Sequence, residues 1–298
     1  MDFEGWGLQR WANHFNQMLN KANPPDRYRF DVGALAIETT RHMFPGDPIT
    51  KVEEDDLEGF AGALVPADSR KRWGICYGKG QQPGRRRFTI AHEFGHYLLH
   101  RKKYPNGIHS SEAAVDGRTK LEVEREANEF ASWLLMPLDD FRKQIAPRDK
   151  PDFDAIGSCS DRYEVSLVAA VLRWLRYTER RSIFVTSVDG YVKWAWSSDA
   201  AFKSGVFIRT SRGDPVELPA GSAVRQEQFT PETRSGVDHP VGVWFNQAAR
   251  EHSFWSDKYE TAYTLVHLAD AEPKLWAEGK PLEDTYERFE RGSSELPR

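Results

Sequence analysis

Two histidines and a glutamate stand close together in His92-Glu93-Phe94-Gly95-His96, which has the pattern HExxH. Residues four apart on a helix lie on one face, so His92 and His96 can direct two imidazoles at one point, as zinc binding requires. Glu93 projects about 100° around the helix from His92, where its carboxylate can take a proton from a water molecule at the metal. The pattern is short enough to occur by chance, so its surroundings decide its meaning.

The residues around the motif predict an amphipathic helix. Thr89 is the predicted N-cap, and no proline interrupts the run that follows. Ile90, Phe94 and Leu98 fall on the face opposite the two histidines, so the apolar side is expected in the core and the polar side at a cleft. Because Gly95 is a poor helix former, we expect another backbone to approach closely there.

A catalytic zinc needs a third protein ligand. The metzincin arrangement would place glycine at position 99 and histidine at position 102, but the chain has Leu99 and Lys102, which excludes that class. His100 continues the four-residue spacing, yet it lies about 12 Å along the helix axis from His92, too far to share one tetrahedral ion. We therefore expect His100 to support a ligand or cap the helix.

A carboxylate from a second helix, at residues 121–131, can complete the ligand set. Four residues there follow the spacing i, i+3, i+4, i+7 and share a face: Glu124, Ala127, Asn128 and Ala131. The two alanines let this face come close to Gly95, so Glu124 would reach the metal. Asn128, one turn further, could hydrogen-bond a ligand histidine.

The alternative for these acidic residues is a solvated surface formed by Glu122, Glu124, Glu126 and Glu129. The alanine–asparagine stripe favours Glu124 as a ligand. Glu122 and Glu126 lie off the face that carries this stripe.

These blocks together resemble the ImmA/IrrE metallopeptidases. The resemblance rests on three segments. Residues 87–100 include HExxH, residues 124–131 begin with Glu-Arg-Glu-Ala-Asn and so match the pattern E-x-x-A-N, and residues 134–137 are Leu-Leu-Met-Pro. A later helix that begins at a Val-Ser pair, at residues 163–172, is similar to another element of the family. The resemblance covers roughly residues 25–178. It implies a zincin-like α+β core with one zinc per chain, held by His92, His96 and Glu124, with Glu93 as the catalytic base.

Composition and length set broader limits. With 298 residues, two domains are expected, a metallopeptidase domain at 1–179 and a β-rich domain at 180–298. No apolar run reaches the length of a membrane span, and the start lacks the features of a signal peptide. The two cysteines, Cys76 and Cys159, are expected to be buried thiols, so a cytoplasmic protein without membrane partners is predicted.

The net charge of −4 argues against sequence-specific binding of nucleic acid by the whole chain. Basic residues do cluster around the motif, at positions 70–72, 79, 85–87 and 101–103. They form either a solvated loop rim or a rim that steers an acidic or DNA-bound substrate to the cleft.

The first part of the chain is predicted to contain helices at residues 5–21 and 31–43 and strands at 62–65 and 73–77. In zincin folds a strand before the HExxH helix lies along the cleft, where an extended peptide can pair with its edge. The predicted substrate edge strand consists of Trp73, Gly74, Ile75, Cys76 and Tyr77. Further helices are predicted at 121–135 and 164–178.

The second part is predicted to be rich in strands. Residues 182–188 and 191–196, with Asp189-Gly190 between them, predict a hairpin with a type I′ turn. Further strands are predicted at 205–210, 241–246 and 261–268, and a charged helix at 273–298. Some members of the family carry a GAF-like domain here and others an N-terminal helix-turn-helix, for which this chain shows no clear pattern before residue 50.

The function predicted from these features is a zinc endopeptidase that cuts a specific protein. The resemblance implies a helix-turn-helix repressor of XRE type, cleaved to relieve repression in a stress or mobile-element response. His109 and Tyr104 are weak candidates for a second oxyanion donor. The alternative is a metal-stabilised binding partner without activity, such as one half of a toxin–antitoxin pair, but a purely structural zinc needs no base at Glu93. The oligomeric state stays open.

Overall fold

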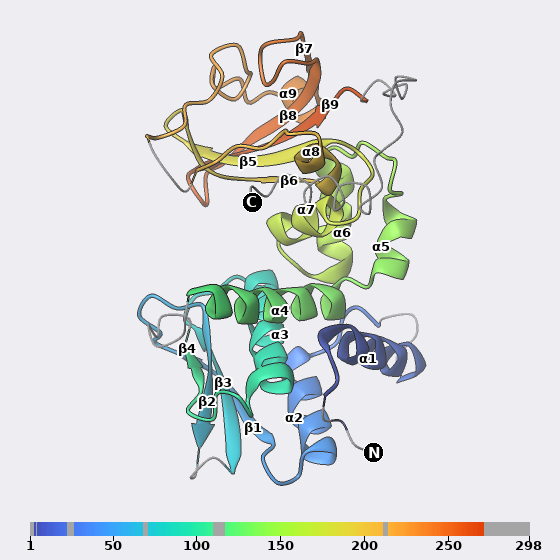
Figure 1. The fold of residues 1–298 in the computed structure, drawn as a ribbon, viewed down its shortest axis with the longest axis vertical. Coiled ribbons are helices and arrows are strands. Elements are labelled where there is room, and N and C mark those ends of the chain that lie inside the picture. Colours follow the sequence, from blue (N-terminus) through green and yellow to red (C-terminus); the bar gives the residue numbers. More distant parts are fainter. Residues whose placement is uncertain are drawn as a thin grey trace, which may run out of the picture.

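The computed structural model describes residue 3 and residues 5–22, 27–67, 71–109, 117–210 and 214–270. Figure 1 shows two parts stacked along the long axis of the molecule, with α4 (Gly117–Leu135) running between them. The fold is a mixed α+β fold with two sheets, as predicted. In the described part of the chain, no helix is long and apolar enough to cross a membrane.

The first sheet and its helices surround the HExxH segment. Their elements, in chain order, are α1 (Leu8–Ala22), α2 (Val32–Met43), β1 (Ile49–Asp55), β2 (Gly62–Ala67), β3 (Arg72–Gly78), α3 (Pro83–His100), β4 (Ile108–His109) and α4. The strand order is β1-β3-β2-β4, with β1 parallel to β3 and the other pairs antiparallel. The predicted strand at 73–77 is therefore a central strand, because β1, which the sequence analysis missed, covers one of its sides.

The second part of the chain builds an antiparallel sheet on a helical base. Its elements are α5 (Leu138–Gln144), α6 (Phe153–Tyr163), α7 (Leu167–Leu175), β5 (Ser182–Val188), β6 (Tyr191–Ser197), α8 (Asp199–Lys203), α9 (Pro231–Ser235), β7 (Val237–His239), β8 (Ala249–Ser256) and β9 (Thr261–Leu268). The strand order is β6-β5-β9-β8-β7. The predicted helix at 273–298 lies outside the described residues.

One hydrophobic core runs from α1 to the second sheet. Phe15 of α1 packs against Phe94 of α3 and Phe130 of α4, with ring centroids 5.3 and 6.3 Å away, and all three side chains are fully buried. The same core includes Trp174 of α7 and Phe184 of β5. Because this core contains residues on both sides of position 180, the predicted division into two domains there stays a prediction.

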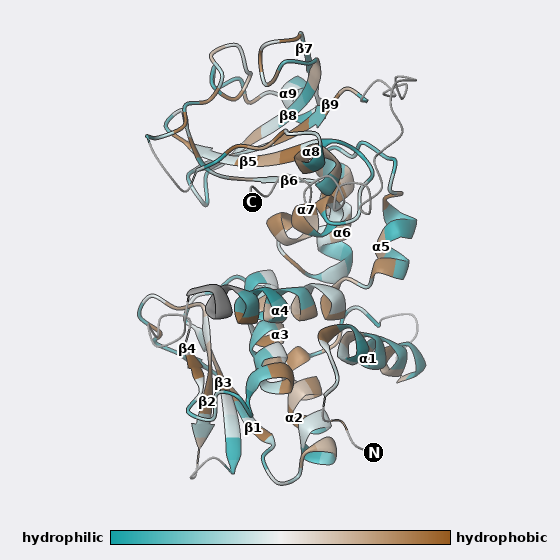
Figure 2. Ribbon diagram, in the orientation of Figure 1, coloured by the Kyte–Doolittle hydropathy of each residue, from teal (hydrophilic) through white to brown (hydrophobic). Residues whose placement is uncertain are grey.

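Strand β5 of the second sheet is buried on both faces. Phe184 joins the core shared with α7, whereas its neighbours Ile183 and Val185 join a separate core on the opposite face. Figure 2 shows the apolar colour of α7 where it lies beside this sheet. A strand with two covered faces reads as a continuous apolar run, which is why β5 is easily predicted from the sequence.

The structure confirms some of the predicted strands and contradicts others. The hairpin is present, and Asp189 and Gly190 have φ angles of 50° and 81°, as a type I′ turn requires. The strand at 261–268 is present as β9. The segments 205–210 and 241–246 do not form strands. Gly242 interrupts the second segment with a φ angle of 96°, and Gly205, with a φ angle of 82°, forms a turn at the start of the first.

Strand β8 escaped prediction because its buried residues are polar. Glu251 is fully buried, and its carboxylate accepts hydrogen bonds from the backbone N–H of Ala223 (3.1 Å) and Val224 (2.8 Å) and from Trp244 Nε1 (2.8 Å). This carboxylate ties the loop before α9 to the sheet. A buried charge with several donors is stable, but it breaks the alternation by which strands are recognised.

A buried carboxylate also joins α5 to α6. Asp140 accepts hydrogen bonds from Tyr163 Oη (2.7 Å) and from Arg162 Nε (2.8 Å) and Nη2 (3.1 Å). Burial alone would raise the pKa of Asp140, but these donors outweigh it and hold the pKa below the usual 3.8.

We expect Asp140→Asn to lower the free energy of unfolding by about 2 kcal/mol at pH 7, since hydrogen bonds to a buried charge are lost. The depressed pKa stabilises the fold above pH 3.8 and this contribution is lost as the pH falls through the folded-state pKa. The difference in the free energy of unfolding between wild type and variant should therefore become smaller in acid. Urea unfolding at pH 7 and pH 3 measures it. Asp139→Asn is the control, because its carboxylate is 66% exposed and should change stability by less than about 0.5 kcal/mol; an equal loss in both variants would contradict the assignment.

Candidate metal centre

Helix α3 carries the HExxH residues. It begins at Pro83, a favoured residue for the first helical position, and runs to His100. The prediction that Thr89 caps this helix is therefore wrong. Thr89 lies within the helix and is buried against Gly62 of β2, where an added Cβ would stand 2.5 Å from its methyl group. The predicted apolar side of the helix is buried.

Close contact between α3 and α4 brings the second helix to the motif. A Cβ at Gly95 would lie 2.9 Å from the Phe130 ring and 3.3 Å from Cα of Ala127. Only glycine fits this position without displacing α4, which confirms the expected close approach of another backbone at Gly95.

The approach of α4 gathers three possible metal ligands. Nε2 of His92 and Nε2 of His96 are 2.9 Å apart, and Glu124 places its carboxylate oxygens 3.3 Å from the first nitrogen and 3.6 Å from the second. All three ligand atoms lie within 4.8 Å of one another. Tetrahedral zinc with bonds of about 2.0–2.1 Å separates its donors by about 3.4 Å, so this set fits zinc.

Outer hydrogen bonds decide which ring nitrogens are free. Asn128 Oδ1 lies 3.0 Å from His92 Nδ1, and an amide oxygen can only accept, so His92 carries its proton on Nδ1. On the other side, Glu126 Oε2 accepts from His100 Nε2 (3.0 Å), which leaves His100 Nδ1 to accept from His96 Nδ1 (3.0 Å). When both imidazoles are neutral, these contacts leave Nε2 of each ring without a proton and facing the other ring.

Two lone pairs facing each other at 2.9 Å repel unless a proton or a cation lies beside them. A metal ion there would relieve this repulsion, and Glu124 would add a negative charge. The donor set and its hydrogen bonds thus fit a bound zinc ion, which is a stronger indication than spacing alone.

The pKa values of Glu124 and His96 favour the ionised carboxylate and the neutral imidazole that a metal needs, whereas that of His92 favours its protonated form while no metal is bound. Burial would raise the pKa of Glu124, but its contacts with His92 and His96 dominate and lower it, so it is a carboxylate at neutral pH. Burial lowers the pKa of His96 to about 4. For His92, burial also acts to lower the pKa, but the hydrogen bond to Glu124 and the charges of Glu93 and Glu124 raise it overall.

Glu93 lies beside this cluster and has the properties of a general base. Its side chain is 3% exposed, and burial raises its pKa to about 7. Its Oε2 atom makes no hydrogen bond within the described part of the chain. The other oxygen lies against Gly62, where an added Cβ would stand 2.8 Å away. A buried carboxylate with a raised pKa and an unused oxygen is suited to take a proton near pH 7.

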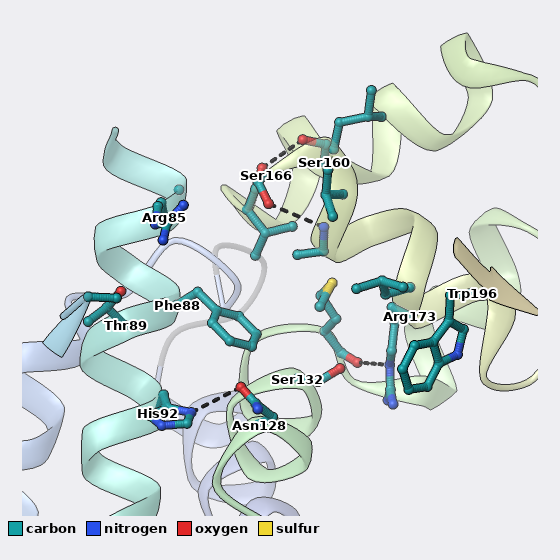
Figure 3. A pocket seen from close by; sticks show the side chains of 18 of the residues that line it. Arg85, Phe88, Thr89, His92, Asn128, Ser132, Ser160, Ser166, Arg173 and Trp196 are labelled. Atoms are coloured by element: carbon teal, nitrogen blue, oxygen red, sulfur yellow. Dashed lines mark hydrogen bonds between the residues drawn. The ribbon is translucent and has the colours of Figure 1, made fainter. Parts of the chain in front are cut away.

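A cavity of about 1280 Å³ extends from these residues toward the second sheet. Figure 3 shows its wall along α3, where Arg85, Phe88 and His92 follow one another, and the facing wall of α4 with Asn128 and Ser132. Helix α7 and the second sheet form the far side, which includes Arg173, Trp194, Trp196 and Tyr263. The candidate metal centre therefore opens into a cleft that both parts of the molecule line.

The predicted substrate edge strand needs correction. Residues Trp73–Tyr77 belong to β3, which pairs with β1 on one side and β2 on the other, so its backbone cannot receive another strand. Trp73 and Cys76 are also buried. The residues of this sheet that line the cavity are Ala61 and Gly62, where β2 begins. The error arose because the charged segment of β1 was not recognised as a strand.

The weak oxyanion candidates do not gain support. Tyr104 does not line the cavity, although its hydroxyl is buried and makes no hydrogen bond within the described residues. The side chain of His109 lies outside the described part of the structure. No second oxyanion donor is assigned.

The basic cluster around the motif is only partly a surface rim. Arg87 is mostly buried and donates to the backbone carbonyls of Tyr28 and Phe30. Arg101 is 6% exposed and pairs with Asp47 at 2.9 Å. These two arginines hold the segments before β1 to α3, while Arg70 lies outside the described residues.

Two residues of the site were not foreseen in these roles. Glu126 was placed off the ligand face, yet it orients His100 and, through it, His96. Arg173 lines the cavity from α7. The position of Glu126 in the sequence does not indicate this role, because Glu126 on α4 reaches His96 only through His100 on α3.

Comparison with known families agrees with the sequence resemblance. Residues 47–175 match the family model of the IrrE N-terminal-like domain, a peptidase family numbered M78. This segment is an IrrE N-terminal-like domain. The resemblance to the ImmA/IrrE family is thereby confirmed, and the domain contains Glu93 and the three clustered ligand candidates. Membership of this segment in a peptidase family supports a peptidase activity.

Similarity beyond this domain is more distant. No curated protein matches the chain. Among solved structures, a Mycobacterium tuberculosis transcriptional regulator is similar, with a TM-score of 0.50 and 15% sequence identity over 86% of this chain and 76% of that one. At this identity the likeness concerns the fold alone. The GAF-like character of the second part stays a prediction.

We predict one zinc per chain, with a graded loss across α4. Glu124→Gln should lose most of the metal, since it removes a charged ligand. Glu126→Gln should keep a complete ligand set but weaken zinc binding about tenfold, as expected when a group that orients a ligand histidine is altered. Elemental analysis and chelator competition measure both.

Glu122→Gln is the control, because that side chain is exposed on the same helix and should bind zinc like the wild type. Stoichiometric zinc in the double variant His92→Ala/His96→Ala would refute the site. Equal affinities of the Glu126 and Glu122 variants would refute the link through His100.

Proposed function

We propose that this protein is a zinc-dependent endopeptidase. The observation that carries the proposal is the cluster of His92, His96 and Glu124, whose ligand atoms lie within 4.8 Å of one another at a cleft that Glu93 also lines. A structural zinc site is more often closed by four protein ligands. Here the described residues offer three, together with a buried base that a structural site does not need.

In this proposal, metal binding and proton transfer are carried out by different residues. His92, His96 and Glu124 would hold the zinc, which when bound lowers the pKa of water and polarises a carbonyl group. Glu93 accepts a proton from the attacking water on its free carboxylate oxygen as the water oxygen bonds to the peptide carbon. Glu93 then gives this proton to the leaving nitrogen as the C–N bond breaks, which restores the carboxylate.

The environment of Glu93 supports both halves of this cycle. Burial raises its pKa to about 7, so at neutral pH it can accept and release a proton with little cost. Gly62 lies against the Glu93 side chain, where an added Cβ would stand 2.8 Å from its Oε1, and this contact restricts where the side chain can point. The base is thus held at the mouth of the ligand cluster before any substrate arrives.

The substrate we propose is a helix-turn-helix repressor of XRE type, cut to relieve repression in the cytoplasm. This part rests on the family resemblance. The cleft lies between α3, α4, α7 and the second sheet, and an extended segment suits a site enclosed on these sides. A folded repressor offers such a segment in a linker or flexible loop. Residues 180–268 would then act in holding the substrate, because Trp194, Trp196 and Tyr263 line the cleft.

The non-enzymatic alternative, a metal-stabilised binding partner, is distinguished by Glu93. We expect Glu93→Gln to keep its zinc and its fold while cleavage falls about 100- to 10,000-fold, because only the proton acceptor is removed. Elemental analysis measures the zinc content, circular dichroism the fold, and mass spectrometry of the products the cleavage. Glu122→Gln serves as the control and should cleave at the wild-type rate; cleavage at that rate by Glu93→Gln would overturn the mechanism.

The specificity of the protein can be tested directly. We expect the zinc-loaded protein to cut the repressor encoded nearest to its gene at one or a few bonds and to leave unfolded casein largely intact, because the enclosed cleft needs contacts beyond the scissile bond. Mass spectrometry of both digests decides between a specific and a general peptidase. Efficient digestion of casein would contradict the proposal, and cleavage of neither protein with zinc bound would favour the binding-partner alternative.

A further inference from the structure

Arg173 is a buried cation at the end of the cleft away from the metal ligands. Its side chain belongs to α7 and is 5% exposed, and Figure 3 shows it in the same pocket as Trp196 and Ser132. Its Nε donates to the backbone carbonyl of Met136 at 2.9 Å. This is the only hydrogen bond of its guanidinium within the described residues, and none of their carboxylates lies within 4.0 Å of it.

An arginine so placed has unused binding capacity. A guanidinium has five N–H donors, and its two outer nitrogens form a fork that matches a carboxylate. The contact with Met136 uses Nε, and it satisfies a carbonyl at the end of α4. Burial lowers the pKa of Arg173 to about 10, so the side chain remains charged at neutral pH without a described counter-ion.

The charges along the cleft are unevenly distributed. Glu93 and Glu124 lie at the end with the metal ligands. The cations that line the cleft are Arg85, Arg173, Arg176 and Lys193. Glu129 also lines it, but this carboxylate is engaged by Arg125 at 3.2 Å and Arg176 at 3.7 Å. A peptide bound along the cleft is therefore favoured when a negative charge lies near Arg173.

The spacing along α4 gives the length of this peptide. Glu124, Asn128, Ser132 and Met136 line the cleft at intervals of four residues. At 1.5 Å per residue, the step from Glu124 to Met136 spans about 18 Å. An extended chain advances about 3.3 Å per residue, so about five residues cover this distance.

We propose that Arg173 forms a substrate subsite that binds the carboxylate of an aspartate or glutamate about five residues from the bond that is cut. The proposal rests on the proposed peptidase function and specifies its substrate as an extended segment with an acidic side chain at that distance. Trp133 and Trp196 line the same cleft, and the guanidinium of Arg173 lies 5.8 Å from the centre of the Trp133 ring, so the side chain of Arg173 is largely shielded from water. In a site removed from water, a charge-assisted bidentate contact is worth about tenfold or more in preference over a neutral residue.

The substrate preference can be read from a peptide library. Zinc-loaded wild type is incubated with a library of variants of the repressor segment that it cuts, in which the positions flanking the cut are randomised, and the cleaved sequences are identified by mass spectrometry. We expect aspartate or glutamate to be enriched about tenfold at four to six residues from the cut on one side. Arg173→Gln should still cleave but lose this preference, since its amide can donate to the Met136 carbonyl without carrying charge.

Arg142→Gln is the matched control. This arginine is exposed on α5 and does not line the cleft, but its charge acts on Arg173. The Arg142 variant should keep the acidic preference. A wild-type profile without the preference, or a preference that survives in Arg173→Gln, would overturn the subsite.

A binding measurement separates failure of the subsite from failure of the peptidase. Glutarate is the probe and glutaramide, its neutral analogue, is the reference. Glutarate should raise the melting temperature of the wild type and of Arg142→Gln, but not that of Arg173→Gln, whether or not any peptide is cleaved. No difference between the two probes in the wild type would overturn the anion site. Glutarate binding combined with cleavage that shows no acidic preference would overturn its assignment to the substrate.

Discussion

The distance between α3 and α4 is the constraint on which the candidate site depends. It is set where Gly95 meets Ala127 and Phe130, and there is no room at Gly95 for even one carbon atom. His92 and His96 come from one helix and Glu124 from the other, so the distance between the two helices sets the distance between the ligand atoms. Packing far inside the core thus determines the geometry of a polar site at its surface.

A second layer of contacts determines the chemistry of these atoms. Asn128 on one side and the pair His100 and Glu126 on the other fix which ring nitrogens carry protons. Both chains of contacts end on α4, so the helix that supplies the carboxylate ligand also orients the two histidines. Position and protonation state are therefore coupled, which is efficient for a site that must bind a cation tightly.

The sequence was sufficient for the parts of the site that follow helix geometry. The spacing of His92 and His96, the stripe that contains Glu124 and the need for close packing at Gly95 are local patterns, and the structure brings these residues together. The roles proposed for them as metal ligands remain predictions. The long apolar β5 and the turn at Asp189 were predicted for the same reason.

The remaining features depend on contacts between distant segments. β3 became a central strand because β1, a segment with several charges, pairs with it. β8 was missed because Glu251 is buried with its own donors. Arg173 and Glu126 acquire their positions from partners on other helices. Sequence periodicity reports which face of an element is buried, but it does not report which polar group finds a partner there.

The packing of α1 shows that family similarity and folding define different units. The recognised domain begins at residue 47, yet Phe15 covers Phe94 and Phe130 on the back of the two helices that carry the site. Without α1, two aromatic rings would face water, at a cost of about 1.5–3 kcal/mol for each. The segment shared with the family thus contains the candidate site, whereas the unit that folds around it also includes α1.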